Sequence, residues 1–195
     1  MKIFNLYETR DIEIKDPALD GVICLDEKLV LKSHGRTKEK FAKAKINILE
    51  RLANLIAVPG HRGKKHKIIT GRASGKYTKN MKIVLETMRI IQERTKENPI
   101  KILVKAIENA SPRDEITVIE YGGARYPQAV DMSPMRRVNI VLRHMVHGSY
   151  DKAFNKKPKM HETLANEIIL ASQGSSESFA MGKKNEAEKQ ADSAR

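Results

Sequence analysis

The stretch that decides the fold is EITVIEYGGARYPQAVDMSPMRRVNIVLRHMVHG, residues 115–148. Its first seven residues alternate between two sets of side chains, which is the period of a β-strand. Gly122 and Gly123 tolerate the positive φ of a tight turn, and residues 125–130 return as a second strand. Pro127 lacks a backbone N–H and so confines that strand to an edge. Residues 115–131 therefore predict a β-hairpin, which is marginal alone and needs support from the domain or a partner.

A long helix is expected directly after the hairpin. Ser133 is a suitable N-cap, Pro134 suits the first helical position, and Gly148 is expected to end the helix. At 100° per residue, one side gathers Val138, Val141, Leu142 and Met145. The opposite side gathers Arg136, Arg137, Arg143, His144 and His147. The pattern predicts one packed face and one basic face.

The rest of the chain is read mostly as helices. Apolar residues at helical spacing cover residues 38–58, 81–98, 99–110 and 159–173, and a weakly apolar helix that should fray starts near residue 178. In the first segment the apolar positions are Phe41, Ile48, Leu49, Leu52, Leu55 and Ile56. Its first half is rich in lysine, where the helix dipole favours anions, so either the lysines serve a partner or the helix begins later.

The expected fold class is mainly α, a bundle of about six helices with a protruding two-stranded β-hairpin arm. Residues 1–35 are expected to form an N-terminal arm of short extended pieces, broken at Pro17 and Gly21. The sequence does not indicate whether this arm packs against the domain. Residues 36–195 form the helical domain, with a basic loop at 60–79, the hairpin at 115–131 and the C-terminal helix at 178–195.

The composition excludes several classes of protein. The chain has 195 residues, of which 40% are hydrophobic, enough for one folded domain. It has no run of about 18 apolar residues to cross a membrane and no signal-peptide pattern at its start. The single cysteine, Cys24, excludes an internal disulfide and a cysteine metal cluster. A cytoplasmic location is expected.

The charge is strongly positive and unevenly placed. The net charge is +13, from 37 Lys and Arg against 24 Asp and Glu. Residues 1–31 hold seven acids and four bases, whereas residues 32–79 hold fourteen bases and two acids. Residues 60–79 contain no acid and four glycines, so they cannot form a core. This composition predicts that residues 60–79 form a phosphate-binding loop or, alternatively, a solvated linker.

Signals for an enzyme are weak. Residues 71–77, GRASGKY, have three residues between the glycines and a tyrosine after the lysine, unlike a nucleotide-binding P-loop. His144 and His147 have spacing that suits zinc, but no further ligand is legible, and a solvent- or RNA-facing role is the better interpretation. No cofactor and no metal are expected.

The distribution of cations favours RNA over duplex DNA. Basic residues fall on a loop, a helix face and a hairpin tip, while zinc-finger spacing, a dimer zipper and a recognition-helix pattern are lacking. Tyr121 and Tyr126 could stack on unpaired bases or pack the hairpin onto the domain, with no preference between the two. An RNA-modifying enzyme is the main alternative, and a DNA-binding regulator is a third.

Several motifs, in order, resemble the archaeal and eukaryal form of the ribosomal protein seven family of the small subunit. They are KAKINILERL (43–52), NP (98–99), LVKAIENA (103–110), SPRDE (111–115), YGG (121–123), YP (126–127), AVDMSPMRRV (129–138), LANEII (164–169) and SFA (178–180). The resemblance runs from about Ser33 to Arg195 and carries little of the acidic arm.

The resemblance implies a non-catalytic protein of the cytoplasmic ribosome. It implies binding to the 3′ major (head) domain of small-subunit rRNA, early in assembly of the head and beside other head proteins. It also implies a place at the subunit interface, with the hairpin near exit-site tRNA and mRNA. Arg136 and Arg137 match the family's rRNA-contacting pair, and Gly122 and Gly123 match its hairpin turn.

The expected RNA-binding residues combine the basic segments with these motifs. They are Arg36, Lys38, Lys43, Lys45, Arg62, Lys64, Lys65, Lys67, Arg72, Lys76, Lys79, Arg113, Arg125, Tyr126, Arg136, Arg137 and Arg143. Replacing Arg136 and Arg137 together by Ala is expected to weaken rRNA binding without unfolding the domain.

Overall fold

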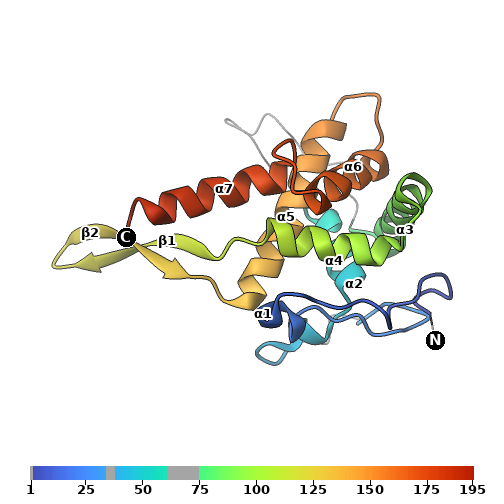
Figure 1. Cartoon of the computed structure of the whole chain (residues 1–195), viewed down its shortest axis with the longest axis horizontal. Coiled ribbons are helices and arrows are strands. Elements are labelled where there is room, and N and C mark those ends of the chain that lie inside the picture. Colours follow the sequence, from blue (N-terminus) through green and yellow to red (C-terminus); the bar gives the residue numbers. More distant parts are fainter. Residues whose placement is uncertain (1, 34–37, 61–74) are drawn as a thin grey trace.

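The chain folds into a helical body from which a hairpin and one helix project side by side (Figure 1). The computed structural model describes residues 2–33, 38–60 and 75–195. In these ranges the helices are α1 (Pro17–Asp20), the 3-10 helix η1 (Ala42–Lys45), α2 (Ile48–Ala57), α3 (Tyr77–Thr95), α4 (Pro99–Ala110), α5 (Pro134–Ala153), α6 (Met160–Ser172) and α7 (Phe179–Asp192). The strands are β1 (Asp114–Tyr121) and β2 (Ala124–Asp131). The prediction of a mainly α fold with a hairpin arm is confirmed.

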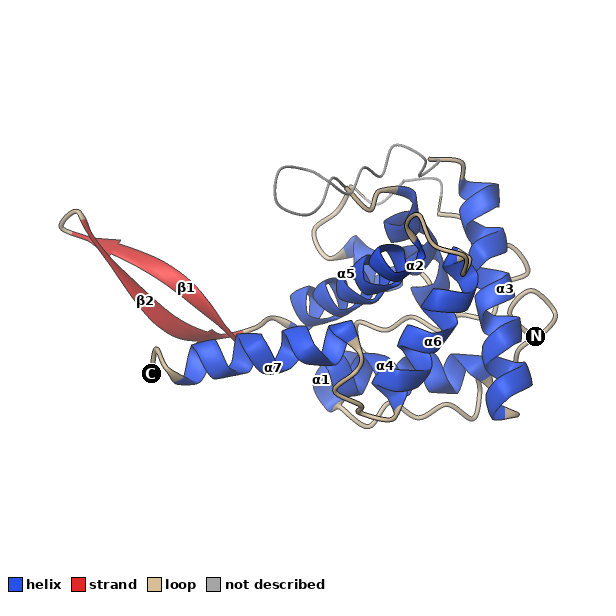
Figure 2. Cartoon of the chain, turned by 90° about the horizontal axis from the view of Figure 1, so that it is seen from above, coloured by secondary structure: helices blue, strands red, loops and turns tan. Residues whose placement is uncertain are grey.

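The core is built around α6, which packs against α3, α4, α5 and α7 (Figure 2). Leu103 and Ile107 of α4, Leu142 of α5, and Leu164 and Ile168 of α6 are completely buried. Each such side chain contributes about 1.5–3 kcal/mol relative to leaving it exposed. The predicted apolar faces of these helices are therefore the faces that meet.

The helix predicted over residues 38–58 begins later, at Ile48. Asn47 is its N-cap, and the Asn47 side chain accepts a hydrogen bond from the backbone N–H of Leu49 at 3.0 Å. Lys43 and Lys45 lie in η1, ahead of the helix, so they do not oppose its dipole. Phe41, expected on the buried face, has φ +65° and is 66% exposed, which corrects that expectation.

The expectation that Gly148 ends its helix is wrong, because α5 continues to Ala153. Gly148 is needed for close packing instead. A Cβ atom placed on Gly148 would lie 2.5 Å from the Cβ of Phe179, the first residue of α7. The glycine thus lets α7 approach α5, a reason that lies in the tertiary structure.

The N-terminal arm is part of the same core. Ile3, Leu19, Ile23 and Leu31 are at most 5% exposed and belong to the main hydrophobic cluster. Pro17, expected to break the arm, instead occupies the first position of the short helix α1. The boundary expected near residue 35 falls among residues 34–37, outside the described residues.

Arg51 of α2 ties the arm to α5. Its side chain donates to the backbone oxygen of Val22 at 2.9 Å and to the Asn139 side-chain oxygen at 3.0 Å. Burial lowers the pKa of Arg51 to about 10, so the guanidinium is still charged at neutral pH. A buried charge held by neutral acceptors costs free energy, and the arm supplies one of those acceptors.

The hairpin has the expected turn and register. Gly122 and Gly123 both have positive φ, +59° and +81°, as a two-residue turn with the right-handed strand twist requires. Ile119 pairs with Tyr126, and Tyr121 pairs with Ala124. Directly opposed residues share a face, so Ile119, Tyr121 and Tyr126 form one apolar face near the tip.

Helix α7 supports the hairpin and lies beside its base in both views (Figures 1 and 2). The side chain of Glu188 accepts the backbone N–H of Arg113 at 3.3 Å, and Arg195 forms an ion pair with Asp114. Ala191, in the last turn, is completely buried. This helix, expected to fray, is formed from Phe179 to Asp192, and the expected support for the hairpin is present.

The N-terminus of α7 is fixed by a carboxylate from α6. Glu167 is completely buried and accepts hydrogen bonds from the Ser178 hydroxyl at 2.7 Å and the backbone N–H of Ala180 at 3.1 Å. The ammonium of Lys152 on α5 lies 2.9 Å from the same carboxylate. One side chain thus joins α5, α6 and α7.

We expect Gly148→Ala to destabilise the protein by about 1–3 kcal/mol, because the new methyl group collides with Phe179 at the close contact of α5 with α7. The matched control is Gly182→Ala in α7, where nothing lies within 4 Å of the new Cβ. That variant should gain up to about 1 kcal/mol from helix propensity. Urea unfolding followed by circular dichroism measures both, and equal stabilities for the two variants would contradict the close contact.

Candidate nucleic-acid interface

The structure describes eleven of the seventeen expected RNA-binding residues. Arg36, Arg62, Lys64, Lys65, Lys67 and Arg72 lie in the ranges 34–37 and 61–74, outside the described residues. Most of the expected basic loop and of the GRASGKY segment lies there too. Eight of these eleven fall on four separate parts of the surface, and Arg113, Arg136 and Arg137 lie where β1 and α5 begin.

The first part precedes α2. Lys38, Lys43 and Lys45 are exposed, as the sequence analysis expected. The ammonium of Lys40 lies 5.4 Å from the ring centroid of Phe41, which is itself exposed. An exposed aromatic ring among lysines can stack on a base while the lysines contact phosphates. The sequence analysis placed Phe41 on a buried helix face, although its lysine-rich surroundings indicate an exposed position.

The second part lies at the start of α3, where Lys76 and Lys79 are exposed. The neighbouring ring of Tyr77 is 5.7 Å from the ammonium of Lys32, which comes from the arm. Lysines from the arm and from α3 therefore meet next to the end of the 61–74 range. This placement can neutralise phosphates of an RNA strand passing there.

Arg136 and Arg137 on α5 have opposite surroundings. Arg136 is exposed, and its guanidinium forms two contacts of 2.6 Å with the carboxylate of Glu115. Arg137 is 7% exposed and donates to the backbone oxygen of Pro112 at 3.1 Å and to Asp16 at 2.8 Å. The expectation that Arg137 belongs to an outward basic face is wrong, because consecutive residues point about 100° apart on a helix.

Asp16 shows how tightly Arg137 is held. Burial raises the pKa of Asp16, but the hydrogen bonds from Arg137 and from the backbone N–H of Ala18 outweigh it, so the pKa of Asp16 falls below its ordinary value. The ion pair connects residues 121 positions apart in the chain. Its structural role is docking the arm onto α5.

The third part surrounds Arg143, which is exposed on α5. A hollow of about 440 Å³ there is lined by Leu55, Val58, Pro59, Gly60, Arg143, Val146 and His147. Its lining includes Gly60, the last described residue before the 61–74 range. A cation beside an apolar surface suits both the phosphate and the base of a nucleotide.

His144, expected on the outward face, is partly buried instead. Its ring lies 6.1 Å from that of Phe179 in an edge-to-face arrangement. Burial, helped by the nearby charges of Lys183 and Arg143, lowers the pKa of His144 to about 4. The side chain is therefore neutral at pH 7 and packs α7 against α5.

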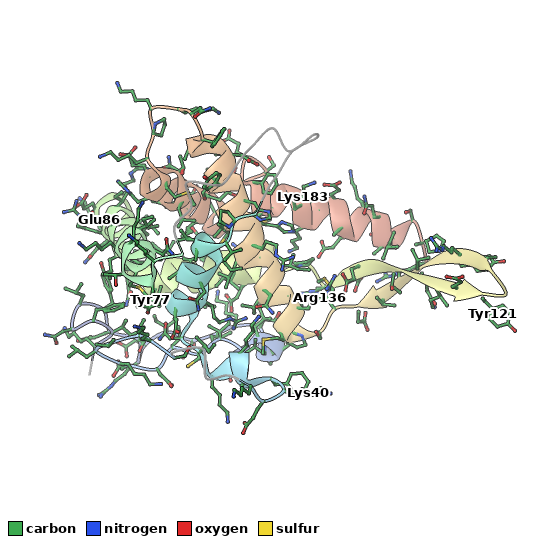
Figure 3. All side chains as sticks on the ribbon, turned by 180° about the vertical axis from the view of Figure 1, so that it is seen from behind. Lys40, Tyr77, Glu86, Tyr121, Arg136 and Lys183 are labelled. Atoms are coloured by element: carbon green, nitrogen blue, oxygen red, sulfur yellow. The ribbon has the colours of Figure 1, made fainter. Side chains whose placement is uncertain are left out.

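The fourth part is the hairpin tip, the element farthest from the body (Figure 3). Tyr121 is 81% exposed and Tyr126 is 59% exposed, so the alternative that they pack the hairpin onto the domain is wrong. Arg125 lies 3.6 Å from Glu120 in an exposed ion pair, a weak interaction that RNA can replace. Stacking by the tyrosines is the alternative that remains.

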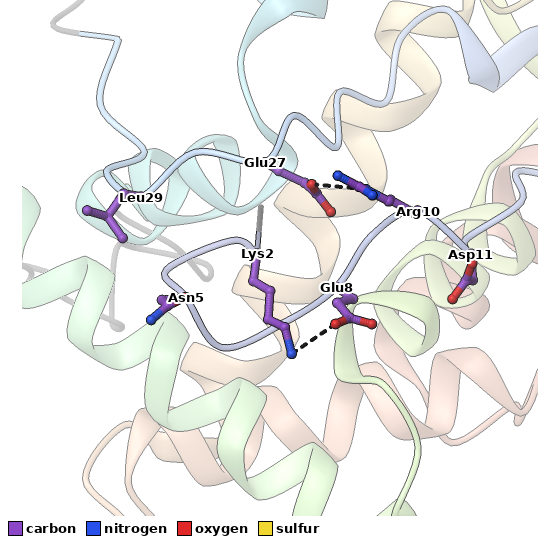
Figure 4. Close-up of a pocket in the computed structure, with 7 residues that line it drawn as sticks. All are labelled: Lys2, Asn5, Glu8, Arg10, Asp11, Glu27 and Leu29. Carbon is purple, nitrogen blue, oxygen red and sulfur yellow. Dashed lines mark ion pairs between the residues drawn. The ribbon is translucent and has the colours of Figure 1, made fainter.

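One hollow on the arm has the wrong charge for RNA. It measures about 670 Å³ and is lined in part by Glu8, Asp11 and Glu27 (Figure 4). The two cations in its wall are already paired, Lys2 with Glu8 at 2.9 Å and Arg10 with Glu27 at 3.6 Å. Phosphates are therefore not attracted to this side of the molecule.

Two further features bear on chemistry. Over residues 2–33, 38–60 and 75–195, no three His, Cys, Asp or Glu side chains are grouped as a metal site would need. No helix in these ranges is both long and apolar enough to cross a bilayer.

These observations define a class of protein, a helical module with exposed cationic surfaces and a β-hairpin supported by the C-terminal helix. The family model described as "Ribosomal protein S7p/S5e" matches residues 25–195, and the chain belongs to this family. The predicted family resemblance is therefore confirmed.

Relatives from several archaea match over nearly their whole length. The small ribosomal subunit protein uS7 of Nanoarchaeum equitans is 49% identical over 100% of this chain and 99% of its own. The proteins of the same name from Methanothermobacter thermautotrophicus and Archaeoglobus fulgidus are 46% and 43% identical, covering 98% and 94% of their own chains. The archaeal type of the resemblance is thus confirmed.

Family membership settles the broad function. The chain is a structural constituent of the small ribosomal subunit, acting in translation in the cytoplasmic ribosome, and it is not an enzyme. The alternatives of an RNA-modifying enzyme and a DNA-binding regulator are therefore wrong.

We expect Arg137→Ala to cost about 2–4 kcal/mol of stability, because it leaves Asp16 without its partner in a partly buried site. Arg136→Ala removes an exposed ion pair and should cost less than about 1 kcal/mol. Urea unfolding of the two single variants measures the difference, and equal losses would show that Arg137 has no special structural role. The double variant is thus a poor test of RNA binding, and Arg136→Ala alone is the correct one.

Because the pKa of His144 is lowered by folding, we expect the free energy of unfolding to fall in mild acid. Because its folded-state pKa of about 4 lies below the ordinary 6.5, the unfolded chain binds more protons, and stability falls as the pH drops from about 6.5 to about 4. Allowing for its partial exposure, the loss is about 1–2 kcal/mol. Unfolding measured at pH 7.0 and 4.5 should show a smaller difference for His144→Gln than for the parent. The same pH dependence in both proteins would contradict this assignment.

Proposed function

We propose that the chain binds the 3′ major (head) domain of small-subunit rRNA and helps to nucleate assembly of the head. The single observation that carries this proposal is the exposure of cations at the start of α3 and around Arg143, which flank the acid-free 61–74 range, together with the exposed lysines before α2. Family membership supports rRNA as the ligand.

The proposed mechanism is neutralisation of charge combined with shape. Lysines and arginines release counterions when they contact phosphates, so they let RNA segments approach that would otherwise repel each other. Phe41 adds a ring on which an unpaired base can stack. The acidic hollow on the arm suits contact with neighbouring head proteins rather than with RNA.

The proposed place of the hairpin is at the subunit interface, near exit-site tRNA and mRNA. Its tip extends beyond the body and exposes Tyr121, Tyr126 and Arg125 (Figure 3). Since α7 holds the base of the hairpin, the tip is presented in a set direction. Exposed aromatic rings and a cation on a preset arm suit contact with single-stranded RNA.

Binding to a 3′ major-domain rRNA fragment tests the proposal. With roughly six to ten phosphate contacts, affinity should fall about 10³–10⁵-fold between 50 and 200 mM salt. Lys43→Gln with Lys45→Gln should lower the salt slope by about two. The matched control is Lys101→Gln with Lys105→Gln, two exposed lysines of α4 outside the proposed surface.

Filter binding at several salt concentrations gives the affinities and slopes. A flat salt titration, or equal binding to a fragment from another rRNA domain, would overturn the assignment to the head domain. Equal slopes for the two double variants would overturn the surface before α2. Co-sedimentation with small subunits checks that the protein assembles.

A further inference from the structure

A hollow of about 350 Å³ lies at the base of the hairpin, where the arm, the end of α4, the start of α5 and α7 meet. It is separate from the surfaces before α2 and around Arg143. Four cations from four segments line it: Lys15, Arg113, Arg137 and Lys184. Such a convergence of positive charge needs an anion close by.

The two carboxylates of the hollow do not supply enough negative charge. Asp16 is paired with Arg137, and Glu108 accepts backbone N–H groups of Lys15 at 2.5 Å and of Asp16 at 3.3 Å. In the described part of the chain, neither Lys15 nor Arg113 forms an ion pair at contact distance, although the charge of Arg113 acts on Asp16. The lining therefore has a surplus of two positive charges.

A buried hydroxyl also lacks a partner at this place. Ser111 is 1% exposed, and its Oγ atom forms no hydrogen bond within the described residues. Buried polar groups are nearly always hydrogen-bonded, so an unpartnered one that lines a hollow points to an absent ligand. A hydroxyl can donate to an anionic oxygen.

We propose that this hollow binds a phosphate group, contributed by the backbone of the rRNA. The phosphate oxygens would accept from the Ser111 hydroxyl, the Arg113 guanidinium, and the ammonium groups of Lys15 and Lys184. Lys184 already donates to the backbone oxygen of Asn109 at 2.7 Å and keeps further N–H groups for the anion. This inference rests on the proposed rRNA binding and names one contact of it.

The bound phosphate would join three parts of the molecule. Lys15 comes from the arm, Arg113 directly precedes β1, and Lys184 lies on α7. A single anion shared among them would add to the support that α7 already gives the base of the hairpin. Charge-assisted hydrogen bonds of this kind are roughly twice as strong as neutral ones.

Titration of the full-length protein with inorganic phosphate is the first test. In ¹⁵N-resolved NMR at low ionic strength, the amide signals of Ser111, Arg113 and Lys184 should shift saturably, and chloride at equal ionic strength should not shift them. Arg113→Gln should weaken the effect about tenfold or more. The matched control is Arg89→Gln on α3, which removes one exposed arginine elsewhere. No saturable shift, or an unchanged response in Arg113→Gln, would overturn the site.

Binding to the 3′ major-domain fragment is the second test and identifies the source of the phosphate. Arg113→Gln should lower affinity about tenfold and reduce the salt slope by about one, while Arg89→Gln leaves both unchanged. A phosphate response with no change in RNA binding would overturn the rRNA source in favour of a free anion. A parent protein that binds no rRNA would instead refute the proposed function, while its phosphate response would still support the anion site. Thermal unfolding of both variants checks that Arg113→Gln stays folded.

Discussion

The buried carboxylate of Glu167 is the interaction on which the projecting half of the molecule depends. It binds the first turn of α7 through Ser178 and Ala180, and it pairs with Lys152 of α5. Burying a charge is costly unless it is paired and hydrogen-bonded, and here all of these partners are present. With its start fixed in this way, α7 can lie along the base of the hairpin, which on its own would be marginal in water.

The N-terminal arm supplies partners for two buried arginines of the helical body. Asp16 neutralises Arg137 inside the fold, and the backbone of Val22 accepts from the buried Arg51. Arginines that would destabilise the body are thereby used to dock the arm, and the remaining cations stay outside. Both arginines therefore find their partners within the fold and need no RNA to balance their charge.

Much of the fold was predictable because it depends on local signals. The Gly122-Gly123 turn and the Ser133-Pro134 helix start are short-range effects of backbone preference, and both are present. The prediction for Gly148 was wrong because it also relied on a local signal alone. A glycine in a helical pattern usually signals an end, whereas here its missing Cβ makes room for Phe179, which lies 31 positions further along the chain.

The sequence by itself determined the helices, the hairpin and the concentration of positive charge in one quarter of the chain, because these follow from periodicity and composition. Only the tertiary structure decided that Arg136 faces solvent while Arg137 is buried, that Phe41 is exposed, and that four cations meet beside Ser111. These outcomes depend on contacts between segments far apart in the chain, and one-dimensional spacing does not encode which helix face a distant segment will cover.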